Sequence, residues 1–414
     1  MPASLTSVTA ILKEVYEGPI SDQLVNDVIG LKRIERTSEG VTSELGGKYV
    51  VFPLRIGRNA GIGARNELEV LPSPGQQGYN AGRVSLKYLY GSCRISGQTF
   101  ELADSNFQAF ASAADLELSG LKSDLLKDQN RQFYGTGMGI LGTATATNAA
   151  NTFPVLAVSG AKYFEVGQAV DIVDGTTLAV AFPTGPTVKA SNRVITAINA
   201  ATGAITFSGA VVSTAVGDIM VRTGSVRREV TGLASVVNDT GALYNIDPAT
   251  ENYWKASVEA NAGSLRPLSE GLMIYTIDRA RQQGGHVSVG FCGLGVRRAY
   301  FELLVQTRRT TNTQDFDGGF KGLAFSTDQG DVPIVVDTDC TDNTLWFPDE
   351  KQIKFYREHE WKFMERDGSM WQRVVAVGGV AGNYDAYEAT MFQYAEMGTH
   401  KRNAHAVLKD ITEG

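Results

Sequence analysis

Cysteine and histidine, the usual ligands of metal centres, are scarce in this chain of 414 residues. The chain has only three cysteines, Cys93, Cys292 and Cys340, and four histidines. Cysteines this few and this far apart predict neither a disulfide framework nor a zinc knuckle. His400 and His405 stand five residues apart, which does not suit a zinc pair on one helix face. We therefore expect no metal site, and we expect the histidines to lie at the surface.

A basic surface and long apolar runs are also lacking. The 38 basic and 45 acidic side chains give a net charge of −7, which argues against a dedicated nucleic-acid binder but not against a container for nucleic acid. The first 18 residues lack a signal-peptide apolar run, and the uncharged stretch 135–161 is too rich in Thr, Asn and Gly to span a bilayer. We expect no membrane association and a reducing cytoplasm.

Catalytic signatures are weak. Residues 137–142 match G-x-G-x-x-G, but they follow a helical pattern instead of a strand, so a joint is predicted rather than a dinucleotide site. His286 and Cys292 carry no recognisable nucleophile signature around them. The sequence therefore predicts no enzyme, no catalytic residue and no cofactor.

Three acidic residues lie close together between positions 337 and 342. An EF-hand loop that began at Asp337 would require Gly and Glu where Asp342 and Pro348 stand. The cluster of Asp337, Asp339 and Asp342 therefore predicts a solvated turn, with a loose cation site as the alternative.

The composition is that of a globular protein of two or three domains. It is 43% hydrophobic and 20% charged, and 45 glycines indicate many turns. Residues 143–225 contain only eight charges and read as an inserted all-β module. Two hairpins are predicted in it, 194–198 with 204–207 and 170–173 with 178–182.

A long two-stranded ribbon is predicted between residues 48 and 96. Strands at 48–56, where Pro53 marks an edge, and at 83–95 flank a stretch rich in Gly, with Pro72 and Pro74. A loop as long as 57–82 is either a disordered tip or a functional reach onto a neighbouring subunit.

A single long helix is predicted at 105–134. Ser105 and Gln108 form a capping box, and Gly135 follows as a stop. Thirty residues would make a rod of about 45 Å. Its apolar positions recur every three or four residues: Phe107, Phe110, Ala114, Leu118, Leu121 and Leu125. A stripe on one face predicts that the helix lies across a sheet or a domain surface.

Charged residues of the ribbon and the helix are our candidates for contacts between copies. One interpretation is that these charges only keep the protein soluble. The functional interpretation is that they form salt bridges between a ribbon and a neighbour's helix. The ribbon candidates are Arg55, Arg58, Arg65, Glu67 and Glu69, and the helix candidates are Asp115, Glu117, Asp124 and Asp128.

The order of these parts resembles the HK97-fold major capsid proteins of tailed bacteriophages. ILKEVYEGPISDQL is similar to the family's N-terminal arm, and LSEGLMIYTIDRARQQGGHVSVGFCGLGVRRAYFELL to its axial domain. GGFKGLAFSTDQGDVPIVVDTDC and WFPDEKQIKFYREHEW resemble the return to the peripheral domain. The implied fold is α+β. Its parts would be an arm (1–47), an extended loop (48–96), a peripheral domain with a spine helix (97–142), an insertion (143–225), an axial domain (226–340) and a return segment (341–414).

The resemblance implies a structural protein that self-assembles as pentamers and hexamers into an icosahedral shell around double-stranded DNA. The location would be the virion, with assembly in the host cytoplasm. Because the arm is short, a separate scaffolding protein is expected, along with a portal and a decoration protein. No lysine lies in 57–82, so the covalent crosslink of some family members is not carried over.

The sequence also allows three other interpretations of the function. An encapsulin-like compartment of the same fold would enclose protein instead of DNA. A β-rich tail protein would account for the middle of the chain, although the long helix argues against it. An enzyme with a β appendage would need a convergent polar site.

Overall fold

The computed structural model describes residues 27–38, 41, 49–98, 107–155, 161–180, 184–199, 201–307, 313–315, 321–327, 330–366, 368–377, 380–382 and 384–414. The chain forms two compact units. The first unit comprises Met1–Val28, Lys87–Val230 and His359–Tyr394, and the second comprises Ile29–Leu86, Thr231–Glu358 and Ala395–Gly414. The arm-like stretch ILKEVYEGPISDQL and the capping residue Ser105 lie outside the described residues.

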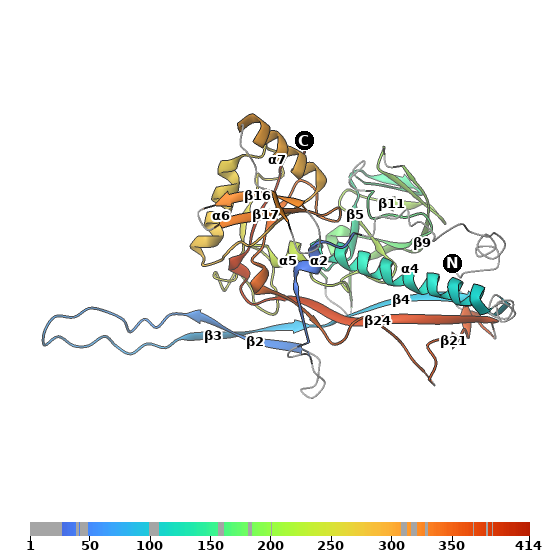
Figure 1. Cartoon of the computed structure of the whole chain (residues 1–414), viewed down its shortest axis with the longest axis horizontal. Coiled ribbons are helices and arrows are strands. Elements are labelled where there is room, and N and C mark those ends of the chain that lie inside the picture. Colours follow the sequence, from blue (N-terminus) through green and yellow to red (C-terminus); the bar gives the residue numbers. More distant parts are fainter. Residues whose placement is uncertain are drawn as a thin grey trace. The chain divides into compact units, whose positions relative to one another are not determined.

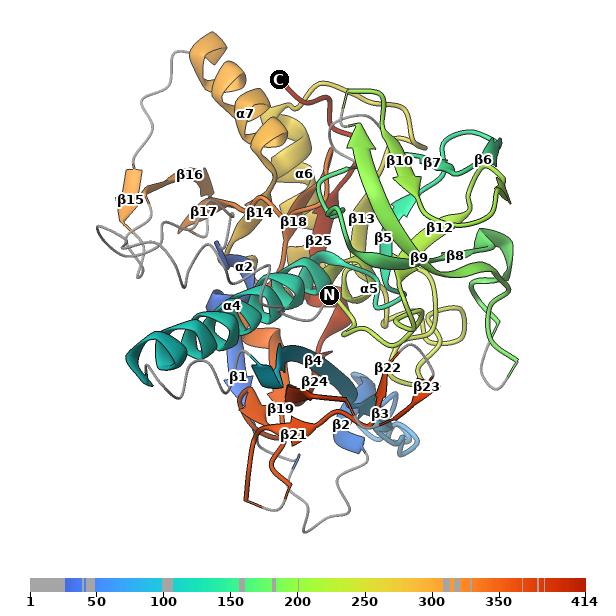
Figure 2. The same ribbon diagram turned by 90° about the vertical axis from the view of Figure 1, so that its right-hand side faces the viewer.

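The first unit is built on one long helix and a sheet. Helix α4 (Phe107–Tyr134) has 28 residues, about 42 Å at the usual rise, and lies along strand β4 (Lys87–Ser96), as Figures 1 and 2 show. β4 pairs with β24 (Ala386–Thr399), which also pairs with β20 (Lys362–Phe363) and β21 (Gln372–Arg373). The expected helix across a sheet is confirmed.

A close approach of backbone to side chain joins the helix to the sheet. A Cβ at Gly91 of β4 would stand 2.7 Å from a methyl of Leu125, so a larger residue there would require the Leu125 side chain to shift. One turn further along α4, the buried Gln129 Nε2 donates to Gln393 Oε1 of β24 at 2.7 Å. One face of this sheet is therefore covered by the helix.

The first unit also contains a separate β module, seen edge-on in Figure 2. Its main sheet has the order β5 (Ile140–Thr143), β12 (Ile219–Arg222), β8 (Ala169–Val173), β9 (Val188–Asn199), β10 (Ala204–Phe207) and β7 (Thr152–Pro154). β6 (Asn148–Ala150) pairs with β11 (Val212–Thr214). The apolar core of the module is buried completely at Phe153, Ile172 and Ile205.

One of the two hairpins predicted in this module is confirmed and the other is wrong. In the first, Ile198 of β9 faces Ile205 of β10. In the second, residues 178–180 are not a strand, and β8 pairs with β9 and β12 instead. Asp174 explains the difference, because its carboxylate accepts from the Thr176 N–H and starts the 3-10 helix Gly175–Thr177 where a hairpin turn was expected.

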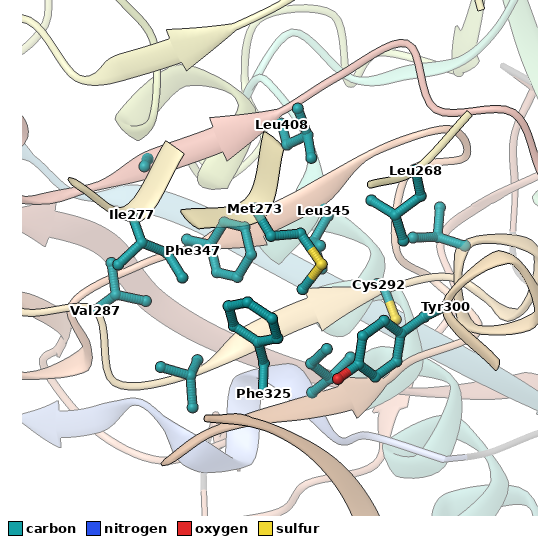
Figure 3. Close-up of a cluster of buried hydrophobic side chains, with 14 of the residues drawn as sticks. Leu268, Met273, Ile277, Val287, Cys292, Tyr300, Phe325, Leu345, Phe347 and Leu408 are labelled. Atoms are coloured by element: carbon teal, nitrogen blue, oxygen red, sulfur yellow. The ribbon is translucent and has the colours of Figure 1, made fainter. Parts of the chain in front are cut away.

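The second unit holds a seven-stranded mixed sheet with two helices. The strand order is β13 (Ser257–Glu259), β25 (Ala406–Leu408), β18 (Leu345–Phe347), β14 (Gly290–Cys292), β17 (Gly330–Val336), β16 (Lys321–Thr327) and β15 (Thr313–Asp315). The two helices are α6 (Glu270–Gln282) and α7 (Leu294–Thr307). Met273 and Ile277 of α6 pack on Phe347 and Leu408 of the sheet (Figure 3).

A two-stranded hairpin also belongs to the second unit. β2 (Tyr49–Gly57) and β3 (Gly78–Ser85) pair antiparallel, from Tyr49 opposite Ser85 to Gly57 opposite Gly78. The single strand predicted at 83–95 is wrong, because β3 ends at Ser85 and β4 begins at Lys87. Val84 is buried among the second unit's side chains whereas Tyr88 is 60% exposed, so the two strands have different environments.

Short elements complete the described fold. In the second unit, α2 (Gly30–Arg33) leads into β1 (Glu35–Thr37), which pairs parallel with β19 (Ile353–Arg357). The remaining elements are α5 (Leu233–Val236), the strands β22 (Ala376–Val377) and β23 (Val380–Ala381), and the 3-10 helices Glu350–Gln352 and Arg402–Ala404. The α+β fold class is confirmed.

Arg402 is a buried side chain of the second unit with five hydrogen bonds to backbone. It is 1% exposed, and burial lowers its pKa to about 10, so it keeps its charge at neutral pH. Its guanidinium donates to carbonyls of Val236, Gly241, Trp254, Ser235 and Thr240. The planar fork of five N–H groups thereby holds a loop that has little regular structure of its own.

Replacing Arg402 with Lys should lower the free energy of unfolding by about 3 kcal/mol, because one ammonium cannot serve carbonyls on several sides. Urea unfolding of the unassembled subunit would measure this. Arg83→Lys, at an exposed arginine of the same unit, is the matched control and should change little. Equal stability of the two variants would show that the five bonds contribute nothing net.

Candidate assembly surfaces

The hairpin continues beyond its last paired residues into a loop of residues 58–77, here called the hairpin tip. Its two arms run side by side to a rounded end (Figure 1). A Cβ at Gly61 would stand 2.6 Å from the Ser73 carbonyl oxygen and 2.8 Å from the Gly75 nitrogen. Glycine is therefore required where the arms meet, and the tip is a narrow, double-stranded extension.

Polar groups shape the end of the hairpin tip. Leu68 has a φ of 68° in a turn where the Asn66 N–H donates to Glu69 Oε2 at 3.0 Å. The same hydrogen bond, together with one from the Asn66 side chain, lowers the pKa of Glu69. Arg65 Nε donates to the Val70 carbonyl and Nη1 to the Ala64 carbonyl, both at 2.9 Å. These bonds hold the turn in one shape.

Apolar side chains occupy the outside of the hairpin tip. Their exposed fractions are 85% for Ile62, 101% for Leu68, 88% for Val70 and 79% for Leu71. Four such side chains in one short loop form an apolar surface of the kind that marks an interaction site. The charged residues of the ribbon did not predict this surface; Leu68, Val70 and Leu71, which follow Asn66, were the signal in the sequence.

The predicted ribbon charges lie along the whole hairpin. Arg55 Nε donates to Gln77 Oε1 at 2.8 Å, and Arg65 and Glu69 are engaged within the tip. Arg58 and Glu67 are exposed. A single chain does not test contacts between copies, so the interface role of all five residues stays a prediction.

The predicted helix acids have different surroundings. Glu117 and Asp124 are exposed on α4, and the side chain of Asp115 lies outside the described residues. Asp128 faces its own subunit, where Arg131 Nε lies 3.0 Å and Arg222 Nη2 3.2 Å from its Oδ1. The role of these four residues in contacts between copies likewise stays a prediction.

Asp128 belongs to a buried ionic cluster at the end of α4. Burial alone would raise the pKa of Asp128, but Arg131 and Arg222 lower it to about 2. Glu229 lies 2.6 Å from Arg131 Nη2, and burial raises its pKa against the pull of that arginine. Because Arg222 stands on β12, the cluster ties the β module to the helix through charge.

Aromatic rings gather on the sheet of the first unit, on the side away from α4. The rings of Tyr88 and Tyr394 are 4.8 Å apart and those of Phe392 and Tyr394 5.3 Å, while His359 lies 4.8 Å from Phe392. Tyr90 joins them at 6.5 Å from Tyr394. These five residues are here called the aromatic face.

Strand alternation explains the aromatic face. In β4, Tyr88 and Tyr90 alternate with Leu89 and Gly91, and the latter two point toward α4. In β24, Phe392 and Tyr394 alternate with buried residues such as Gln393 in the same way. Tyr88 and Tyr90 are 60% and 54% exposed, so this face is open within its own unit.

Comparison with known proteins gives one family match. Residues 210–412, just under half of the chain, match the family model of the SU10 major capsid protein. This match supports a major capsid protein. The resemblance to those of tailed bacteriophages is confirmed. A search of curated protein sequences found no match.

Solved structures give the fold of this capsid protein. The capsid asymmetric unit of cyanophage A-1(L) superposes with a TM-score of 0.55 at 12% identity, over 98% of this chain and 99% of that one. The Mycobacterium phage Bobi structure gives 0.46 at 9% identity (99% and 98% covered), and the holo-SrpI encapsulin complex from Synechococcus elongatus PCC 7942 gives 0.45 at 8% (98% and 95%). The fold assignment rests on the cyanophage capsid.

The residues that the sequence analysis considered for catalysis or cofactor binding do not form a site in the capsid protein. Burial raises the pKa of the Cys292 thiol to about 12, so it remains protonated, while His286 is exposed. The glycines at 137 and 139 have φ values of 77° and 85° and precede β5, so the 137–142 segment is a bend that runs into a strand. Among the described residues, no group of His, Cys, Asp or Glu is placed to hold a metal ion, and no helix suits a membrane span.

Two sequence expectations about polar residues are wrong. Asp337 and Asp339 do not form a solvated turn, since they are 1% and 5% exposed; Asp337 accepts from the N–H groups of Gly30 and Asp339. His405 is completely buried. Its Nδ1 accepts from the Asp349 N–H at 3.1 Å, and its Nε2 lies 2.8 Å from Thr399 Oγ1.

Burial lowers the pKa of His405 to about 3, so the folded capsid protein keeps it neutral. The unfolded chain protonates this histidine near pH 6.5. The free energy of unfolding should therefore fall as the pH drops from 6.5 toward 3. His405 contributes at most about 1.4 kcal/mol per pH unit to this fall. Above pH 6.5, the free energy of unfolding should not depend on the titration of His405.

Chemical unfolding of the subunit between pH 7.5 and 4 would measure this slope. His405→Asn keeps an acceptor for the Asp349 N–H but cannot titrate, so its slope should be shallower than that of the unmodified chain. His286→Asn, at the exposed histidine, should leave the slope unchanged. Parallel slopes for all three proteins would contradict the assignment.

Proposed function

We propose that copies of this capsid protein assemble as pentamers and hexamers into the icosahedral shell of a virion that encloses double-stranded DNA. The observation that carries the proposal is the hairpin tip, whose four exposed apolar side chains stand on a narrow extension. The fold shared with a phage capsid subunit supports the same conclusion. A projecting element of this kind enlarges the contact with a neighbour without enlarging the subunit.

The charge of the chain suits enclosure without tight binding. A net charge of −7 argues against strong overall attraction of double-stranded DNA. DNA would then be held by the closed wall and not by specific contacts. An encapsulin-like protein cargo is the alternative that the contents of purified particles would reveal.

Further roles extend the same proposal. We assign 1–47 as an arm and the hairpin 49–85 as the extended loop, because β4 lies in the sheet of the first unit. The first unit without its insertion would be the peripheral domain. Residues 226–340 would form the axial domain together with β18 and β25, which share its sheet. The insertion at 143–225 would decorate the shell or clamp neighbours. A scaffolding protein, a portal and a decoration protein would be partners during assembly in the host cytoplasm. Exposed charges such as Arg58 and Glu67 would form ion pairs at the rim of these contacts.

The tip can be removed at a defined place. Gly57 and Gly78 are paired across the hairpin, so an Asn-Gly turn can replace residues 58–77 and keep the strands intact. We expect a subunit with unchanged circular dichroism and thermal unfolding that no longer forms shells in electron microscopy and sedimentation. A matched control shortens the exposed loop around Gly263 of the second unit instead. Normal shells from the tip-less chain would refute the role of the tip.

The enclosed cargo is a separate question. Particles assembled during infection or co-expression should protect double-stranded DNA from added nuclease until they are opened by heat. Protection of protein alone would favour the encapsulin-like alternative.

A further inference from the structure

A histidine packs against the base of the hairpin in the second unit. We propose that this residue, His400, is a pH-sensitive switch: its neutral form holds the base of the hairpin against the unit, and its protonated form releases that base. The inference rests on the proposed function of the hairpin tip and adds a means of regulating the element that carries the tip.

One aromatic ring anchors the base of the hairpin. Phe52 of β2 is 6% exposed, and its ring lies across the opposite strand, because a Cβ at Gly82 would stand 2.5 Å from it. The His400 ring lies 4.9 Å from the Phe52 ring, at an interplanar angle of 31°. The Tyr244 ring meets Phe52 edge-on at 6.1 Å. The anchor of the hairpin therefore packs on a tyrosine and on a titratable imidazole.

The hydrogen bond of His400 suits the neutral imidazole. Its Nε2 lies 2.6 Å from the hydroxyl oxygen of Tyr356, which is 3% exposed. The neutral tautomer with its proton on Nδ1 lets Nε2 accept from that hydroxyl. A protonated Nε2 would donate instead, and the buried O–H of Tyr356 would have to turn to another acceptor. Protonation therefore weakens the contact that orients the ring.

The surroundings of His400 oppose a positive charge on balance. Burial and, after it, the nearby ammonium of Lys354 on β19 lower the pKa of His400, while Glu35 on β1 raises it. Lys354 and Glu35 lie 3.5 Å apart, so each also offsets the charge of the other. Lys401, the next residue in the chain, donates its ammonium to the Gly284 carbonyl. His400 is therefore neutral at pH 7 and above.

Protonation and packing of the hairpin base oppose each other. A histidine ring exposed to water has a pKa of about 6.5. Because the packed ring has the lower pKa, the free energy that keeps the base closed is complete above pH 6.5 and falls as the pH drops below that value. One proton changes the ratio of closed to open base by at most about tenfold per pH unit. Acid thus favours a hairpin whose base is free to move.

The first test uses the reciprocity of this coupling. If protonation of His400 releases the hairpin, packing of the hairpin must lower the pKa of His400 by the same free energy. NMR titration of histidine-labelled subunits measures that pKa, with the signals of the four histidines assigned by substitution. Phe52→Ala removes the packed ring and should raise the pKa of His400 toward 6.5. The chain with an Asn-Gly turn in place of residues 58–77 keeps Phe52 and is the matched control; its His400 should titrate as in the unmodified chain. An unchanged pKa in Phe52→Ala would overturn the inference.

The second test measures the opening itself by hydrogen exchange with mass spectrometry. Unassembled subunits are labelled between pH 7.5 and 5.5, with labelling times scaled to the intrinsic exchange rate. Protection of residues 49–57 and 78–85 should fall toward pH 5.5, whereas β8 and β12 of the first unit should keep theirs. His400→Gln still accepts from Tyr356 but cannot titrate, so the hairpin strands should lose this pH dependence. His286→Gln, at the exposed histidine, should retain it.

The outcomes separate the switch from the proposed function. Equal pH dependence of hairpin exchange in the His400 and His286 variants would overturn the switch, even if the subunits form normal shells. If His400→Gln does not fold, the titration of the Phe52 variant decides. Shells assembled by the tip-less chain would instead refute the role of the tip, whatever the titration of His400.

Discussion

A two-stranded hairpin cannot bury its own surface, and this constraint governs the protein. Such a ribbon is marginal by itself in water, because each strand has one free edge and neither face is covered. Here the base of the hairpin is fixed by packing: Val50, Phe52 and Val84 belong to a buried cluster with Trp254 and Tyr356. The tip has no comparable cover among the described residues of its unit, so its stable burial requires something beyond that unit.

The anchoring of the hairpin base depends on buried polar groups far along the sequence. Arg402 holds the loop that ends at Trp254, and the Trp254 indole N–H donates to the Leu243 carbonyl at 3.2 Å. The next residue, Tyr244, accepts from the Arg83 N–H of β3 and donates its hydroxyl to the Met397 carbonyl at 2.6 Å. The hairpin is thus rigid at its base because an irregular loop is tied down by one guanidinium.

Local patterns predicted the elements that are stabilised locally. α4 was predicted from its apolar stripe and the β9–β10 hairpin from its two short strands. Elsewhere, contacts between residues distant in sequence determine the structure, and local patterns did not predict it. Alternation runs unbroken through Val84 and Tyr88, yet one packs on Trp254 and the other belongs to another unit. His405 and Asp337 look like surface residues until Asp349 and Gly30, distant in sequence, supply their partners.

Charged and apolar residues have different roles at the hairpin tip. This difference explains why the charged residues did not predict the candidate assembly surface. An exposed ion pair between copies gains little in water and is weakened by salt, so charges alone would make a contact that varies with conditions. The tip uses Arg65 and Glu69 to shape a turn at short range, where a hydrogen bond to backbone is geometrically defined. It leaves the contact surface to Leu68, Val70 and Leu71, whose burial is insensitive to salt in the physiological range. A shell that must first assemble and then persist depends on apolar contacts of this kind. Charged residues then select the orientation in which two copies meet.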